Sequence, residues 1–159
     1  MRKFKVAMVQ HKVPTSNVGE NTELAIRYIT EAKADGADFV LFPECFLSAY
    51  QFPKICETLQ SVEEIETNDE FAKWCEGALD DDCTYLEKIR RVAKELSIGV
   101  EITCLTKGKK YPQNTAFIID RDGSIILKYS KVHTCDFDLE RYLESGKEFK
   151  VCHFDGICI

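Results

Sequence analysis

The chain has 159 residues, enough for one domain with a hydrophobic core, and its 45% hydrophobic and 30% charged residues are ordinary for a globular protein. Its net charge of −6 argues against a nucleic-acid-binding protein, which would usually present a basic face. The apolar runs are short and the basic start lacks an apolar h-region, so we expect neither a transmembrane helix nor a signal peptide.

The chain is rich in cysteine, with eight residues of this type. No C-x-x-C pair occurs, and several cysteines, such as Cys104 and Cys158, stand inside apolar segments. This pattern favours reduced, mostly buried thiols in a cytoplasmic protein over a disulfide framework. The spacing of zinc ligands is absent too, so we expect no metal site and no cofactor.

The first half of the chain predicts a βαβ unit. Residues 3–9 have the apolar and β-branched character of a strand, and a polar loop follows. After Asn21, apolar residues recur at three- and four-residue steps, which indicates an amphipathic helix that closes at Gly36. Residues 37–44, ADFVLFPE, are apolar on both faces and predict a central strand. This order predicts parallel pairing of the two strands and an α/β fold.

The second half predicts one more helix and a run of strands. Residues 52–80 are polar and acidic, and we expect a loop with one or two short helices that covers a site. The next segment, residues 80–97, predicts a helix with an aspartate as N-cap. Strands are expected in IGVEITCLT, NTAFIID and SIILKYSK, the last two joined by an Arg-Asp-Gly hairpin turn. Residues 148–159 begin another β segment and end inside an apolar run, so we expect the chain to be part of a longer domain.

Four stretches, taken together and in order, resemble the nitrilase, or carbon–nitrogen hydrolase, superfamily. They are KVAMVQ, FPECFLSAY, NTAFIIDRDGSIILKYSKVH and DLERYLESGKEFKV. The resemblance implies an αββα sandwich, incomplete at the C-terminus, with residues 1–159 forming the N-terminal portion of the domain. It also implies a small-molecule amide as substrate, no cofactor, and assembly into a homo-oligomer.

The resemblance also implies roles for individual residues. Glu44, after Phe-Pro, matches the general base, and Lys131, before Val-His, matches the catalytic lysine. Glu140 is the favoured match to a further glutamate, with Glu144 as the competing one. The nucleophilic cysteine of the family is expected a few residues beyond residue 159, and Cys158 is the nearest candidate within the chain.

The chemistry of these residue types supports such roles. A thiol attacks as thiolate, and a carboxylate within hydrogen-bond reach can take its proton. A fixed cation then stabilises the negative charge that attack builds on the substrate. A separation above about 8 Å between Glu44 and Lys131 would exclude a shared substrate atom. We expect Cys45, beside Glu44, to be a core residue pointing away from it, and His133 to order the loop after Lys131. Asn114 is a weaker candidate, with an amide that would hold the start of its strand near the site.

Three functions are considered. The first is hydrolysis of non-peptide carbon–nitrogen bonds, in small linear amides or N-carbamoyl amines, through a thioester formed by a Glu-Lys-Cys mechanism. The second is a catalytically inactive, truncated protein of the same fold that acts as a binding or assembly module. The third is a nucleotide-binding α/β module, which the absence of GxGxxG and GxxxxGK[ST] motifs disfavours.

Overall fold

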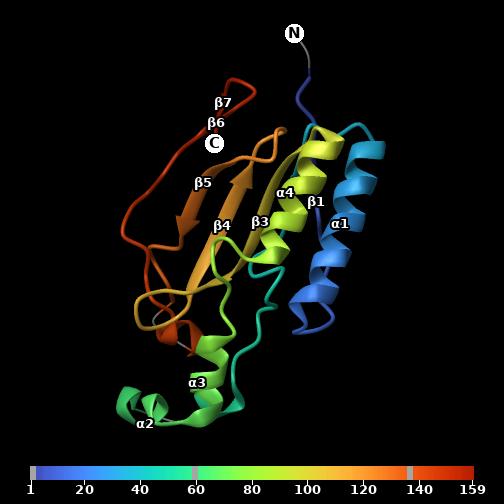
Figure 1. The fold of residues 1–159 in the computed structure, drawn as a ribbon. Helices are drawn as coiled ribbons and strands as arrows, with labels where there is room; N and C mark the ends of the chain where they lie inside the picture. The colour runs from blue at the N-terminus through green and yellow to red at the C-terminus, as the bar shows by residue number, and fades with distance from the viewer. Residues whose placement is uncertain (1–2, 59–60, 136–137) are drawn as a thin grey trace.

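A five-stranded mixed sheet forms the centre of the fold, in the order β1-β2-β3-β4-β5 (Figure 1). The computed structural model describes residues 3–58, 61–135 and 138–159. Strands β1, β2 and β3 pair in parallel, whereas β3, β4 and β5 pair antiparallel. The bounds of the strands are β1 (Val6–Met8), β2 (Phe39–Leu41), β3 (Gly99–Thr106), β4 (Gln113–Ile119) and β5 (Ile125–Ser130).

Two long helices, α1 (Val18–Ala34) and α4 (Thr84–Leu96), cover one face of this sheet side by side (Figure 1). Their apolar stripes and the sheet residues that face them form the main core, because alternate residues of a strand point to the same face. The predicted βαβ start and the α/β class are therefore confirmed. Among the described residues, no helix is both long and apolar enough to span a membrane.

The structure corrects both helix starts. Helix α1 begins before the predicted position, with Asn17 as its N-cap accepting from the backbone N–H groups of Gly19 and Glu20. Asn21 is instead buried, and its side-chain amide donates to the backbone oxygens of Thr15 and Leu47. The N-cap of α4 is Cys83, whose side chain accepts no capping hydrogen bond.

The predicted aspartate cap is not formed, and two of the three aspartates before α4 pair with lysines instead. Asp80 pairs with Lys107 at 2.7 Å and Asp81 with Lys128, so these acidic residues link the helix start to the sheet. These two carboxylates are therefore engaged away from the helix end, where Cys83 takes the cap position.

The polar segment after β2 contains short helices, as its sequence predicts. They are η1 (Lys54–Glu57), α2 (Val62–Glu66) and α3 (Asp69–Glu76). This group packs against a further short helix, η2 (Asp138–Tyr142), through a separate apolar cluster. The cluster contains Cys56, Ile65, Phe71 and Tyr142. Helices α2 and α3 lie beyond the lower end of the sheet in Figure 1.

A hairpin of β6 (His153–Phe154) and β7 (Ile157–Cys158) forms a second, two-stranded sheet. It packs on the face of the main sheet that the helices leave uncovered, where Phe154 contacts Phe39 and Ile118. Gly99 lies so close to this hairpin that an added Cβ atom would sit 2.4 Å from the Phe154 ring. The order of layers is therefore helices, five-stranded sheet and hairpin.

Candidate active site

Lys131 occupies the centre of a cluster of charged side chains at one end of the sheet. Its Nζ atom lies 3.0 Å from Glu44 Oε1 and 2.9 Å from Glu140 Oε1. Its backbone is also fixed, because its N–H donates to Asn114 O and its carbonyl accepts from Gly146 N, both at 2.8 Å. The predicted approach of Glu44 and Lys131 is confirmed, well inside the limit of about 8 Å.

Glu44 stands in a turn that follows β2. The strand ends at Leu41, three residues earlier than the sequence suggests, because Phe42 and the residues after it hydrogen-bond to β3 side chains instead of a neighbouring strand. The Glu44 side chain is 46% exposed, and its Oε1 atom accepts from both Lys131 and the side-chain amide of Asn114. Glu44 therefore combines a fixed position with access from solvent.

Glu140 is the buried carboxylate of the cluster, with a side chain only 4% exposed. Besides Lys131, it accepts from Tyr50 OH at 2.8 Å and from the backbone N–H of Cys135 at 2.7 Å. Burial alone would raise the pKa of Glu140, but these donors lower it more, to about 2. Glu140 is therefore a carboxylate that stays ionised near neutral pH.

The two glutamates also determine the charge of Lys131. Burial opposes a charged ammonium, but the hydrogen bonds that Lys131 donates to Glu140 and Glu44 outweigh it and raise the Lys131 pKa. Lys131 is thus a fixed cation. Glu144, the competing match, accepts from the backbone N–H of Lys110 at 2.9 Å and lies outside this network.

Cys45 lies beside the cluster but is completely buried, as expected for a core residue. Its backbone is left-handed, with φ of 54°, and its thiol donates to Asn114 Oδ1 at 3.6 Å. Burial first, and the negative charge of Glu44 second, raise the Cys45 pKa to about 12. The thiol therefore stays protonated, whereas attack requires a thiolate.

Cys158 is not brought to the cluster. It lies exposed on β7, in the hairpin that packs against Phe39 at the start of β2, whereas Glu44 follows the end of that strand. Figure 1 shows this hairpin at the opposite end of the sheet from the short helices α2 and α3, which follow Glu44 in the chain. The ring of His133 lies 5.7 Å from that of Phe149. Its role in ordering the loop stays a prediction.

Sequence reasoning missed Tyr50 and gave little weight to Asn114. The hydroxyl of Tyr50 reaches Glu140 across 90 residues of chain, and only its place in the FLSAY stretch after Glu44 pointed to the site. Asn114 contacts Glu44 and Cys45 with opposite ends of one amide. In the part of the chain that the structure describes, no group of His, Cys, Asp and Glu side chains could hold a metal ion.

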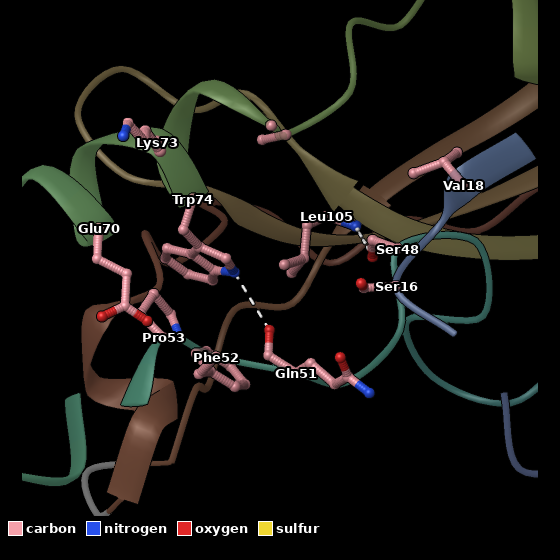
Figure 2. Close-up of a pocket in the computed structure, with 12 residues that line it drawn as sticks. Ser16, Val18, Ser48, Gln51, Phe52, Pro53, Glu70, Lys73, Trp74 and Leu105 are labelled. Carbon is pink, nitrogen blue, oxygen red and sulfur yellow. Dashed lines mark hydrogen bonds between the residues drawn. The ribbon is translucent and has the colours of Figure 1, made fainter. Parts of the chain in front are cut away.

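A pocket of about 420 Å³ lies next to the segment that carries Tyr50. Ser48, Gln51 and Phe52 line it from this segment, and Trp74 and Leu105 form much of its apolar wall (Figure 2). The Trp74 indole N–H donates to Gln51 O at 3.2 Å, which ties α3 to the same segment. Residues 48–52 therefore border the pocket and, through Tyr50, the charged cluster.

Comparisons with known proteins all point to one family. The carbon-nitrogen hydrolase family model matches residues 5–159. The omega-amidase NIT2 of Pongo abelii is 30% identical, covering 99% of this chain and 53% of its own. The one of Xenopus tropicalis is 32% identical over 87% of this chain and 44% of its own. The chain thus spans about half the length of the curated relatives it matches.

Solved structures agree on the fold. An amidase from Nesterenkonia sp. superposes with a TM-score of 0.70 and 19% identity, over 98% of this chain and 53% of that one. A cysteine variant of the amidase from Nesterenkonia sp. AN1, in complex with butyramide, gives a TM-score of 0.72 at 20% identity, over 98% of this chain and 53% of that one. The five-stranded sheet and its helices therefore match the nitrilase fold, and this chain belongs to the carbon-nitrogen hydrolase family.

Proposed function

We propose that this chain supplies the base and the cation of an amide-hydrolysing site, with Glu44 as general base, Lys131 as the stabilising cation and Glu140 as the group that holds Lys131. The observation that carries the proposal is the single ammonium placed within 3.0 Å of Glu44 and 2.9 Å of Glu140. The omega-amidases and the amidase among its relatives support amides as the substrate class.

Each carboxylate suits a different task. Glu44 is exposed enough to meet a substrate and a thiol, whereas Glu140 is buried and saturated by donors from Lys131, Tyr50 and Cys135. A proton acceptor must exchange its proton during the reaction, so the accessible group fits this role. The buried group fits an electrostatic role, because it keeps Lys131 charged and in place.

The reaction starts when Glu44 takes the proton of a cysteine thiol and the sulfur attacks the amide carbon. A C–S bond forms, and Lys131 stabilises the negative charge on the amide oxygen. The C–N bond then breaks, and protonated Glu44 returns its proton to the leaving ammonia or amine. Water, deprotonated by Glu44, attacks the thioester carbon and the C–S bond breaks. Glu44 then returns this proton to the departing sulfur, so that the acid and the thiol are released.

We place the nucleophile on a cysteine beyond residue 159. Three thiols within the chain are poorly suited. Cys45 is buried and protonated, Cys158 lies in the distant hairpin, and a hydrogen bond to Glu140 raises the pKa of the Cys135 thiol. The chain after β7 would have to run back along the sheet to bring such a cysteine to Glu44. This assignment, like assembly into a homo-oligomer, rests on the family.

Small linear amides are the favoured substrates, ahead of nitriles, with N-carbamoyl amines as the closest alternative. The prediction that residues 52–80 cover a site is supported by the pocket, because Phe52, Lys73 and Trp74 of this segment line it. A pocket of this size, mostly apolar with a few polar groups, suits a small organic molecule.

The test uses the protein encoded by the complete reading frame that contains these residues. Release of ammonia from butyramide and from linear ω-amides should be detected, and both E44Q and K131M should lower it by about 10²-fold or more. Mass spectrometry of the intact protein should show a thioester adduct that E44Q reduces. Full activity of both variants would contradict the assigned roles.

A binding or assembly module is the second candidate, favoured by the burial and the raised pKa of Cys45, the thiol adjacent to Glu44 in the chain. The same assay separates the two functions. A folded wild-type protein that binds amides or partners without releasing ammonia would support the module and exclude the hydrolase.

A further inference from the structure

Strand β3 makes many of the hydrogen bonds that hold the turn carrying Glu44. Alternate residues of a strand share a face, and here residues 101, 103 and 105 all contact the turn. Glu101 Oε2 accepts from the backbone N–H of Phe42 at 2.9 Å. The N–H of Leu105 donates to Ser48 Oγ at 2.9 Å, the bond drawn dashed in Figure 2. The turn is thus fixed at both of its ends.

Thr103 fixes the middle of the turn, on both sides of Glu44. Its hydroxyl donates to the carbonyl of Pro43, the residue before Glu44, and accepts from the N–H of Phe46, at 3.0 Å. Its own backbone carbonyl accepts from Leu47 N at 3.0 Å. The Thr103 side chain is buried, being 6% exposed, so these bonds face little competition from water.

The backbone between these two hydrogen bonds has a conformation that it would not keep without support from its surroundings. Cys45 lies in the left-handed region with φ of 54°, a conformation that disfavours residues other than glycine. Such a conformation persists only where the surrounding structure imposes it. The Thr103 hydroxyl bridges the two peptide groups that flank Glu44 and Cys45, and so it opposes relaxation of the turn.

We propose that Thr103 is a positioning residue for Glu44: its hydroxyl sets the turn so that the carboxylate meets Lys131. The inference rests on the proposed function in one respect, namely that Glu44 acts as the base. Thr103 itself touches no substrate. Its effect is transmitted through Pro43 and Phe46, and it depends on the hydroxyl rather than on the size of the side chain.

Three variants separate this role from a general contribution to stability. T103V keeps the volume but removes the hydroxyl, and T103S keeps the hydroxyl. T106V is the matched control, because Thr106 is also buried in β3 and hydrogen-bonds through its hydroxyl, at 2.7 Å, to Thr115 on the other face of the strand. T103V and T106V should lose similar stability, because each removes one buried hydroxyl.

The first measurement is NMR of the 159-residue chain, which needs no activity. In T103V the ¹³Cδ resonance of Glu44 and the Lys131 side-chain resonances should shift, and amide exchange at Phe46 should rise by about tenfold or more, since its acceptor is lost. T103S and T106V should resemble wild type at these positions. Wild-type resonances for Glu44 in T103V, or an unprotected Phe46 amide in the wild-type chain, would overturn the proposal.

The second measurement is steady-state kinetics of the protein from the complete reading frame. T103V should lower kcat by about 10- to 100-fold with KM changed less than about threefold, since misplacing a reacting group costs rate more than binding. T103S should restore most of kcat, and T106V should leave it unchanged. An inactive wild-type protein would overturn the proposed hydrolase, while the NMR comparison would still decide the role of Thr103.

Discussion

Each end of the sheet carries one cation between two carboxylates, yet the two clusters differ in what they leave accessible. At the start of β2, Arg121 binds Asp38 at 3.1 Å and Asp155 at 2.7 Å, and donates to Ser97 O as well. Beyond the end of β2, Lys131 binds Glu44 and Glu140. The first cluster joins the hairpin to the sheet, and the second surrounds an accessible carboxylate.

The type of cation accounts for much of this difference. The planar guanidinium of Arg121 donates in several fixed directions and also lies 5.1 Å from the centre of the Phe154 ring. Lys131 is a compact charge whose donors can turn between two glutamates and a substrate oxygen. The guanidinium of Arg121 is already bound to the hairpin, which suits a structural role. The ammonium of Lys131 lies beside the half-exposed carboxylate of Glu44, which suits a catalytic role.

The largest expected effect separates the clusters by activity. K131Q should lower amide hydrolysis by about 10³-fold, because the cation that stabilises the developing charge is lost. R121Q should leave kcat within about threefold, since Arg121 acts on the hairpin and not on the reacting atoms. Ammonia release by the protein from the complete reading frame measures both. Equal losses in the two variants would remove the functional distinction.

The next effect concerns acid stability and Glu140. A carboxyl whose pKa is lowered on folding stabilises the folded state above its unfolded pKa of 4.5, and this contribution disappears as the pH falls toward about 2. E140Q should therefore lose up to about 3 kcal/mol at neutral pH and show a flatter loss of stability below a pH of about 4.5. Urea unfolding across this pH range measures it.

The matched control for E140Q is E144Q. Glu144 belongs to the same segment but contacts the backbone of Lys110 and not Lys131. Its substitution should change the free energy of unfolding by only about 1 kcal/mol. The assignment of the two glutamates would be reversed if E144Q flattened the loss of unfolding free energy at acid pH and E140Q left it as in the wild-type protein.

Two glycines allow a further comparison of the clusters, because each lies where two segments of backbone or side chain pack closely beside one of them. An added Cβ at Gly146 would lie 2.0 Å from the Ser130 carbonyl oxygen, next to Lys131, and one at Gly99 would lie 2.4 Å from Phe154. G146A and G99A should each cost about 1–3 kcal/mol in thermal or urea unfolding. Only G146A should also lower kcat, and loss of activity in G99A alone would contradict the scheme.

The smallest effect is expected at Tyr50. Y50F removes one donor from Glu140 and leaves Lys131 and Cys135 in place, so it should cost about 1 kcal/mol and lower kcat a few-fold. Y28F, on α1, is the control and should leave kcat unchanged. A loss as large as that of K131Q would mean that Tyr50 takes a direct part in the reaction.

Local sequence patterns predicted most of the fold. The strands around Val40 and Cys104 and both long helices follow from apolar periodicity, and the turn at Gly123, with φ of 83°, follows from Arg-Asp-Gly. The helix caps were missed because Asn17 and Asn21 are equally good caps locally. Only tertiary contacts, the bonds from Asn21 to Thr15 and Leu47, decide between them.

Only part of the candidate site could be predicted from the sequence. Glu44 and Lys131 stand in ordered motifs, and the structure places them together. The choice of Glu140 over Glu144 as the partner of Lys131 depends on how residues 138–142 turn, which no periodic pattern reports. Tyr50 and Thr103 were missed for the same reason, since their partners lie 90 and 60 residues away.

The seclusion of Cys45 has a consequence for chemical selectivity. A side chain that is fully buried, protonated and adjacent to a carboxylate is a poor target for alkylating agents, which react with exposed thiolates. Haloacetamides and maleimides should therefore modify the exposed Cys158 long before Cys45. The turn can thus carry a thiol next to its carboxylate without that thiol competing for electrophiles.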